Sequence, residues 1–259
     1  MTYSLIPEAM IKNLILSIVY SLLLFFLIGI TACTSPLSEE RITDLSLIKA
    51  EINIVQNPEN KKANTVIVIL QDKKGRRISN DSITIIVNGT SGALQHRQGL
   101  YYSNESGYVL SDVPVNEAYE VSIKLPDQTI HPLGAVNALI EEKTANITCN
   151  GQGDLNEDFT IFWRDLKNID ELSVFVSVLQ KNSPPNEKNY GYKPEKIIKI
   201  NPEGYYTIPK STYVTDSTII SGIEFDLRTT RQGKVNPDLA AGSKISISTL
   251  IEKNVNFEE

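Results

Sequence analysis

Four oxygen-bearing side chains in one acidic segment have a spacing that could hold a hard cation. Asp154, Asn156 and Asp158 occupy alternate positions, and Asp165 stands at the twelfth position of the same run. Oxygen ligands at that spacing, closed by a carboxylate at position twelve, are what Ca²⁺ requires from a binding loop. The sixth position of such a loop needs glycine for a sharp turn, but here it is the bulky Phe159, which begins a strand-like run. The segment favours an acidic linker leading into a strand, and a Ca²⁺ loop is the alternative.

Tyrosine side chains form a second group of candidate binding residues. Tyr190 and Tyr192 stand in the polar, proline-containing stretch 180–194, which we expect to be a long, mobile surface loop. An exposed tyrosine beside asparagine can pack its ring against a sugar or a protein while its hydroxyl group makes hydrogen bonds. We therefore nominate Tyr190 and Tyr192 as ligand-binding residues, and a solvated loop without a binding role is the alternative. In pairs such as Tyr205-Tyr206, strand alternation should turn one ring inward and leave the other exposed.

The chain offers little for catalysis. His96 lies in a polar loop and His131 directly precedes a proline, and no Gly-x-Ser-x-Gly, His-Glu-x-x-His or phosphate-binding Gly-Lys motif occurs. Two cysteines, Cys33 and Cys149, exclude a disulfide framework and leave too few soft ligands for a cysteine-histidine zinc site. Cys149 is expected to behave as a small buried hydrophobe, with an intermolecular thiol as the alternative. We expect a protein that is not an enzyme and has no cofactor; a hydrolase with paired carboxylates is the third-ranked alternative.

The overall composition is that of a folded, acidic protein. The chain has 259 residues, of which 41% are hydrophobic, and its 25 Lys+Arg against 31 Asp+Glu give a net charge of -6. Negative charge would repel the phosphates of a nucleic acid, so no nucleic-acid partner is expected. One large or two modest domains fit this length.

The N-terminus carries the features of a targeting segment. Residues 14–30 read LILSIVYSLLLFFLIGI, an uncharged run that follows Lys12 and precedes small residues. A basic residue, an apolar stretch and a small-residue cleavage site make up a secretory signal peptide, which we place at residues 1–32. Met10 is a better translation start than Met1, because the first eight residues carry an acid and no base. A membrane-spanning signal anchor is the alternative, since seventeen apolar residues are near the lower limit for crossing a bilayer.

The segment that follows the apolar run indicates a lipid anchor. The four residues Ile30-Thr31-Ala32-Cys33 resemble the lipobox of bacterial lipoproteins. The resemblance implies that Cys33 is lipidated, for example with palmitate, and that its acyl chains hold the protein to a membrane. Residues 33–47 are polar and read as a tether, in which the acidic pair Glu39-Glu40 resembles the surface-export signal of Bacteroidota lipoproteins. That resemblance implies an outer-membrane protein displayed on the cell surface, and attachment facing the periplasm is the alternative.

The rest of the chain predicts β-structure. Runs of β-branched and aromatic residues recur between turn formers, and no window keeps a helical repeat of apolar residues. The fold class we predict is therefore all-β, with two tandem β-sandwich domains over residues 48–150 and 151–259. The strands are expected at residues 45–55, 65–70, 82–87, 107–110, 119–125, 159–163, 172–179, 196–200, 204–208, 219–228 and 244–251.

Both halves resemble known sandwich families. The run Val66 to Ile78, with its Asp-x-x-Gly turn, together with the segments 107–114 and 119–123, is similar to prealbumin-like and carboxypeptidase-regulatory-like domains. The run Phe159 to Trp163 resembles the tryptophan-bearing strand of fibronectin type III and immunoglobulin-like domains, which implies that Trp163 lies in the core. The whole chain resembles Bacteroidota cell-envelope lipoproteins, and neither fold likeness carries over a catalytic residue.

These observations predict a membrane-anchored, non-enzymatic envelope lipoprotein that acts as a binding or structural module. Its partners would be the membrane and a glycan or an envelope or host protein. One alternative is a glycan-binding accessory of a polysaccharide-uptake system. The other is a fimbrial or adhesin subunit, which would polymerise by strand exchange.

Overall fold

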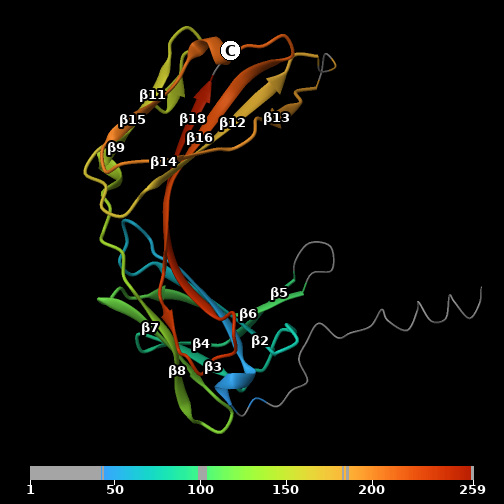
Figure 1. The fold of residues 1–259 in the computed structure, drawn as a ribbon. Coiled ribbons are helices and arrows are strands. Elements are labelled where there is room, and N and C mark those ends of the chain that lie inside the picture. The colour runs from blue at the N-terminus through green and yellow to red at the C-terminus, as the bar shows by residue number, and fades with distance from the viewer. Residues whose placement is uncertain (1–41, 43, 99–103, 183, 185–186, 258–259) are drawn as a thin grey trace, which may run out of the picture.

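The computed structural model describes residues 42, 44–98, 104–182, 184 and 187–257 (Figure 1). The predicted signal peptide, Cys33 and most of the tether lie outside these residues. The described chain is all-β, as predicted, with three short 3-10 turns at Leu45–Leu47, Thr144–Asn146 and Lys210–Thr212. Within it, no helix has the length and hydropathy needed to cross a membrane.

Two sheets form the first lobe, in the lower half of Figure 1. One sheet contains β1 (Lys49–Val55), β2 (Asn64–Gln71), β6 (Asn104–Val113) and β5 (Leu94–Gln98). The other is the five-stranded sheet β17 (Lys234–Val235), β8 (Ile130–Asn137), β7 (Ala118–Lys124), β3 (Thr84–Val87) and β4 (Thr90–Gly92). Alternation explains the packing of β7, because Tyr119, Val121 and Ile123 are buried while the residues between them are not.

The second lobe is also built from two sheets. The larger sheet contains β13 (Tyr190–Tyr192), β14 (Lys196–Lys199), β12 (Glu171–Gln180), β16 (Thr218–Gln232), β18 (Lys244–Phe257) and β10 (Gln152–Gly153). The smaller, three-stranded sheet contains β15 (Gly204–Ile208), β11 (Phe159–Trp163) and β9 (Ile147–Thr148). Trp163 is buried between the sheets, as predicted, and its indole N–H donates a hydrogen bond to the carbonyl oxygen of Asn201 (3.0 Å).

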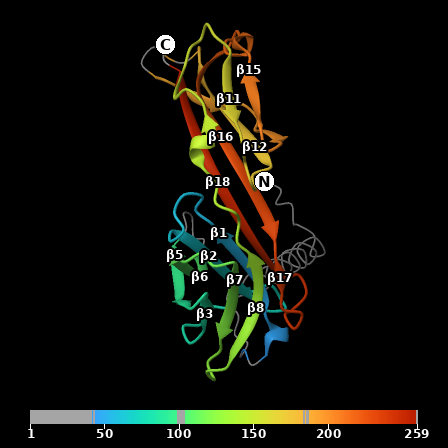
Figure 2. The same cartoon turned by 90° about the vertical axis from the view of Figure 1, so that its left-hand side faces the viewer.

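The long strands β16 and β18 run through both lobes, so that one ten-stranded sheet backs the whole molecule (Figure 2). Alternate residues of β18 are buried on one face along its length. Ile245 and Ile247 belong to the first hydrophobic core, whereas Ile251 and Val255 belong to the second. The first core therefore contains residues from both sides of position 150, the boundary expected from the sequence.

A set of buried polar side chains holds the junction between the lobes. The amide of Gln56 donates to the carbonyl oxygen of Leu139 (2.8 Å) and accepts from its N–H (3.0 Å). The carboxylate of Glu142, only 2% exposed, accepts hydrogen bonds from the backbone N–H groups of Lys167 (2.9 Å) and Asn168 (2.6 Å). These contacts satisfy buried backbone donors and fix the segment that connects β8 to the second lobe.

The turn between β3 and β4 has the conformation that its sequence predicts, whereas two other segments differ from the predicted structure. Asn88 and Gly89 both have positive φ (49° and 82°), as a two-residue hairpin turn between β3 and β4 requires. The strand expected from residue 45 begins only at Lys49, because a 3-10 turn precedes it. Residues 190–192, placed in a surface loop by their polar neighbours, instead form β13 at the edge of the larger sheet. The rest of that stretch includes residues outside the described part of the chain.

Candidate binding surface of the second lobe

An exposed aromatic pair stands on the outer face of the three-stranded sheet. Along β11 the side chains of Phe159, Ile161 and Trp163 point into the core, so Phe162 points away from it. Phe162 lies directly opposite Tyr205 of β15, with the ring centroids 6.0 Å apart and the planes inclined by 40°. The two residues are 53% and 69% exposed. We call this pair the aromatic platform.

A groove borders the platform on the side of β9. It has a volume of about 410 Å³ and is walled on one side by Phe162. Its other lining residues are mostly polar: Thr148, Asn150, Gln152, Asp154, Glu157, Asp158 and Thr160. We call it the Phe162 groove. An apolar ring next to carboxylates, amides and hydroxyl groups is a combination suited to a ligand with one apolar face and many hydroxyl groups.

Local hydrogen bonds hold the acidic wall of the groove in place. The carboxylate of Asp154 accepts a hydrogen bond from the backbone N–H of Asn156 (2.7 Å). The carboxylate of Asp158 accepts one from the backbone N–H of Lys210 (2.8 Å), whose ammonium group donates to the carbonyl oxygen of Asn156 (2.7 Å). The turn before β11 is thus tied to the turn after β15, and the groove is preformed.

The structure does not bring the four predicted calcium ligands into one loop. Asp154, Asn156 and Asp158 lie in the turn before β11, whereas Asp165 follows its far end. The five extended residues of β11 separate the two groups by about 16 Å, at about 3.3 Å per residue. Asp165 pairs instead with the ammonium group of Lys167, which lowers the pKa of its carboxyl group. A twelve-residue Ca²⁺ loop is therefore absent from residues 154–165, because the strand that Phe159 begins runs through its middle.

Tyr190 and Tyr192 lie on a different face from the platform. They are 59% and 80% exposed and stand opposite Leu179 and Ser177 of β12. Between them, Gly191 stands opposite the buried Val178, so both tyrosines project from the outer face of the larger sheet. The predicted ligand-binding residues are therefore exposed and share a face, but they belong to the opposite side of the lobe from the Phe162 groove.

The sequence predicts the exposure of Phe162, although only tyrosines were nominated as ligand-binding residues. The alternation of FTIFW places Phe162 outside once Trp163 is assigned to the core. The prediction for the Tyr205-Tyr206 pair is confirmed, since Tyr205 is exposed while Tyr206 packs against the second core. Asn150 and Gln152 line the groove because strands distant in the sequence meet there, and no local sequence pattern predicts such contacts.

The cysteine and the described histidine do not form a nucleophile–base pair at the groove. Cys149, half-buried, lines the groove and packs against the second core, and burial raises the pKa of its thiol. It is therefore a thiol rather than a nucleophilic thiolate at neutral pH. His131 lies in β8 of the first lobe, where its ring contacts the hydroxyl group of Thr129 (3.0 Å). The titratable residues that line the groove are Cys149, Asp154, Glu157 and Asp158, and none of its lining residues is a histidine.

Comparisons with known proteins give no family. No family model matches the sequence, and no curated protein matches it. Among solved structures, SGBP-B of the Bacteroides ovatus mixed-linkage glucan utilization locus, in complex with a heptasaccharide, is 13% identical, with a TM-score of 0.22 over 86% of this chain and 46% of that one. The Yersinia pseudotuberculosis adhesin InvE is 13% identical, with a TM-score of 0.22 over 81% and 59% of the two chains. The Escherichia coli adhesin FdeC is 10% identical, with a TM-score of 0.25 over 84% and 66%.

The chain spans about half to two thirds of the length of these three structures. TM-scores of this size do not establish a shared fold. The sandwich architecture therefore rests on the sheets described above, and any function rests on the geometry of the surface.

Proposed function

We propose that this protein is a lipid-anchored, non-enzymatic binding module of the bacterial cell envelope, and that its ligand is a carbohydrate chain. The ligand would lie across the aromatic platform and along the Phe162 groove. Such a module would serve as a glycan-binding accessory at the membrane to which the lipid on Cys33 attaches it.

The observation that carries this proposal is the aromatic platform. Phe162 and Tyr205 expose more than half of their surface on the outer face of the three-stranded sheet, although burial of such rings is normally favoured. Each ring offers an apolar face to the C–H groups of a sugar, and the pair spans two neighbouring strands. The preformed polar wall provides hydrogen-bond acceptors and donors for sugar hydroxyl groups, so little ordering would be needed on binding.

The anchor is proposed from the sequence alone. Residues 33–47 were expected to form a tether, but Ile42 and Leu45 are buried in the first core, so the tether left by lipidation at Cys33 would end before Ile42. A tether of that length would hold the sandwich near the membrane surface while leaving the groove of the second lobe accessible. Placement at the outer membrane, with the protein facing outward, remains part of the proposal.

Binding is tested by affinity electrophoresis of the protein without its signal peptide in gels that contain a panel of soluble polysaccharides. Retardation by at least one polysaccharide is expected, and Phe162→Ala and Tyr205→Ala should each reduce it. Tyr190→Ala and Tyr192→Ala are matched controls, because they remove exposed rings from the other face. If the controls abolish retardation and the platform variants do not, the assignment to the platform is wrong.

Anchoring is tested by metabolic labelling of the expressing cells with radiolabelled palmitate. Label is expected in the wild-type protein and not in Cys33→Ala. Shaving of intact cells with protease, with a periplasmic protein as the control, then distinguishes display on the surface from attachment facing the periplasm. Absence of label in the wild-type protein would contradict the lipoprotein assignment.

A further inference from the structure

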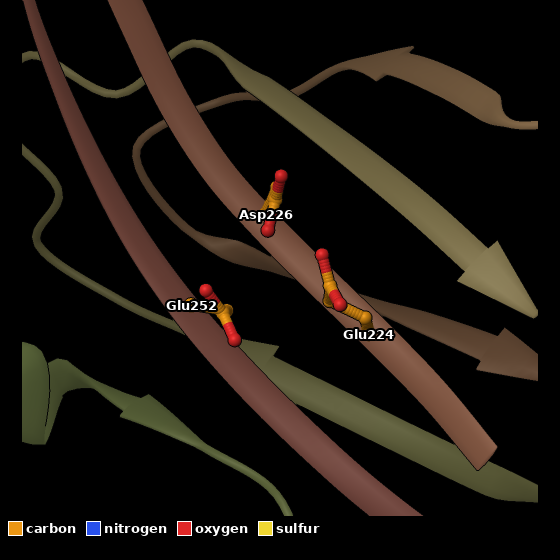
Figure 3. A group of neighbouring side chains, drawn as sticks. All are labelled: Glu224, Asp226 and Glu252. Atoms are coloured by element: carbon orange, nitrogen blue, oxygen red, sulfur yellow. The ribbon is translucent and has the colours of Figure 1, made fainter. Parts of the chain in front are cut away.

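Three carboxylates converge on the outer face of the larger sheet, away from the Phe162 groove. Asp226 of β16 stands directly opposite Glu252 of β18, and Glu224 occupies the next outward position of β16. Each side chain offers a carboxylate oxygen, and these oxygens lie within 4.8 Å of one another (Figure 3). The cluster bridges the two strands that run through both lobes.

The three carboxylates form no ion pair with a described lysine or arginine, although Arg228 lies close enough to act on the charge of Asp226. The nearest base along β16 is Arg228, and its guanidinium group is paired with Glu171 (2.7 Å) and Glu195 (3.3 Å). The side-chain amide of Asn254 donates one hydrogen bond to Glu252 (2.5 Å).

Burial and mutual repulsion penalise the charged form of this group. Burial raises the pKa of Asp226, and the charge of Glu252 raises it further, although Arg228 acts in the opposite direction. The pKa of Glu224 is raised by burial and by the charges of Asp226 and Glu252. Three carboxylates whose oxygens lie within 4.8 Å of one another repel each other when they are charged, and a bound cation would compensate that repulsion.

Two buried polar atoms, one in the cluster and one beside it, have no hydrogen-bond partner among the described residues. Ser173 of β12 stands directly opposite Asp226 on the same face of the sheet, and it has no exposed surface. Opposed side chains in an antiparallel pair are about 5 Å apart at Cβ, so the side chain of Ser173 is a direct neighbour of the side chain of Asp226. Neither the hydroxyl oxygen of Ser173 nor Oδ1 of Asp226, both shielded from solvent, has a hydrogen-bond partner among the described residues. A fully buried, unpartnered hydroxyl group next to an unpartnered carboxylate oxygen is independent evidence for a missing ligand.

We propose that Glu224, Asp226 and Glu252 bind a Ca²⁺ ion, with Ser173 beside the site. Three equally spaced oxygens bound to one Ca²⁺ ion at about 2.3–2.6 Å are about 4.0–4.5 Å apart. The three carboxylate oxygens lie within 4.8 Å of one another, so side-chain shifts of less than about 1 Å would bring them to that spacing. Mg²⁺ fits this cluster less well, because it requires near-octahedral geometry at about 2.0–2.1 Å and usually keeps several water ligands beside one or two carboxylates. Water completes the coordination sphere on the solvent side. The bound ion joins β16 to β18 across the face opposite the second core.

The site is tested by isothermal titration calorimetry of the chelator-treated protein with CaCl₂. One Ca²⁺ ion per chain is expected, with a dissociation constant on the order of 10⁻⁴–10⁻³ M, as for extracellular calcium modules. Asp226→Asn and Glu252→Gln should each weaken binding at least about tenfold, because each removes a charged ligand. Glu203→Gln is the matched control, since it neutralises an exposed acid elsewhere in the same lobe.

Thermal unfolding separates a lost site from a damaged fold. Without Ca²⁺, Asp226→Asn and Glu252→Gln should unfold at the same temperature as the wild-type protein or above it, because each substitution relieves repulsion between the carboxylates. Addition of Ca²⁺ should raise the unfolding temperature of the wild-type protein and of Glu203→Gln, but not that of the two site variants. If Asp226→Asn does not fold, the exposed Glu252→Gln variant still carries the test. The proposal is overturned by the absence of saturable binding up to about 10 mM Ca²⁺, tenfold above the weakest expected constant. It is also overturned if both variants bind like the wild-type protein or if Mg²⁺ binds as tightly as Ca²⁺.

Discussion

Separation of the chain near residue 150 should destroy the first lobe rather than release a stable domain. A fragment of residues 34–150 lacks Leu239, Ile245 and Ile247, which are at most 8% exposed and belong to the first core. It also lacks the parallel pairing of β1 with residues 244–248 of β18. Truncation of one buried isoleucine to alanine costs about 2–5 kcal/mol, so loss of the two isoleucines alone amounts to about 4–10 kcal/mol. The whole stability of a domain is about 5–15 kcal/mol, and the fragment is therefore expected to be largely unfolded.

The assay is the dispersion of amide signals in the ¹⁵N–¹H NMR spectrum of the fragment, followed by urea unfolding of any folded population. The control is the same fragment joined through a flexible linker to residues 233–249, which restores the missing strand. The control should give a dispersed spectrum and the bare fragment should not. In the full chain, Ile247→Ala should lower the free energy of unfolding by about 2–5 kcal/mol. A cooperatively folded bare fragment would refute the conclusion that both lobes depend on β18.

Two further predictions concern buried polar groups. Glu142→Ala should lower the free energy of unfolding in urea by about 2–6 kcal/mol, because the backbone N–H groups of Lys167 and Asn168 each lose a buried acceptor, at about 1–3 kcal/mol per group. Glu141→Ala, at the neighbouring exposed position, is the control, and equal effects of the two substitutions would contradict the role of Glu142. Burial raises the pKa of Tyr119 to about 12 from 10.0, so the unfolded chain ionises first and the stability contributed by this group is lost as pH rises from about 10 to 12. Tyr119→Phe should therefore lose less stability over that interval, and it should be no less stable at neutral pH because the buried hydroxyl group has no partner among the described residues. Identical pH profiles for the two proteins would contradict this account.

Local patterns were sufficient to predict the fold class and most strands. Alternation of apolar residues predicted β7 and β12 to within one or two residues, and it placed β11 at residues 159–163 as observed. The two-residue Asn88-Gly89 turn was also predictable, because few residues other than asparagine and glycine accept positive φ at both positions. These features depend on neighbours in the sequence, where the pattern is visible.

Pairing between distant strands could not be predicted in the same way. The sequence indicated a strand at residues 244–251, but β18 extends to Phe257 and is shared by the two cores. Its register against β1 is set by residues almost 200 positions apart. The short strands β9, β10 and β17 have too few residues for any periodicity, and they exist because a longer neighbour offers hydrogen-bonding groups.

In the candidate site too, local features were predictable from the sequence and contacts between distant strands were not. The exposure of Phe162 follows from the alternation of β11, whereas its contact with Tyr205 depends on the pairing of β11 with β15. The acidic segment was recognised, but its spacing suggested a calcium loop, since spacing alone does not report the strand that separates Asp165 from the other acids. The cluster around Asp226 has no sequence motif, because β16 and β18 supply it together.

The most direct test of the proposed function is hydrogen–deuterium exchange of the protein with and without an oligosaccharide that retards it in affinity gels. The account predicts slower exchange on ligand addition in residues 147–163 and 204–208, which carry the aromatic platform and the Phe162 groove. It predicts no change in residues 190–192, whose tyrosines project from the other face. Protection confined to residues 190–192, or located in the first lobe, would contradict the assignment of the ligand to the platform.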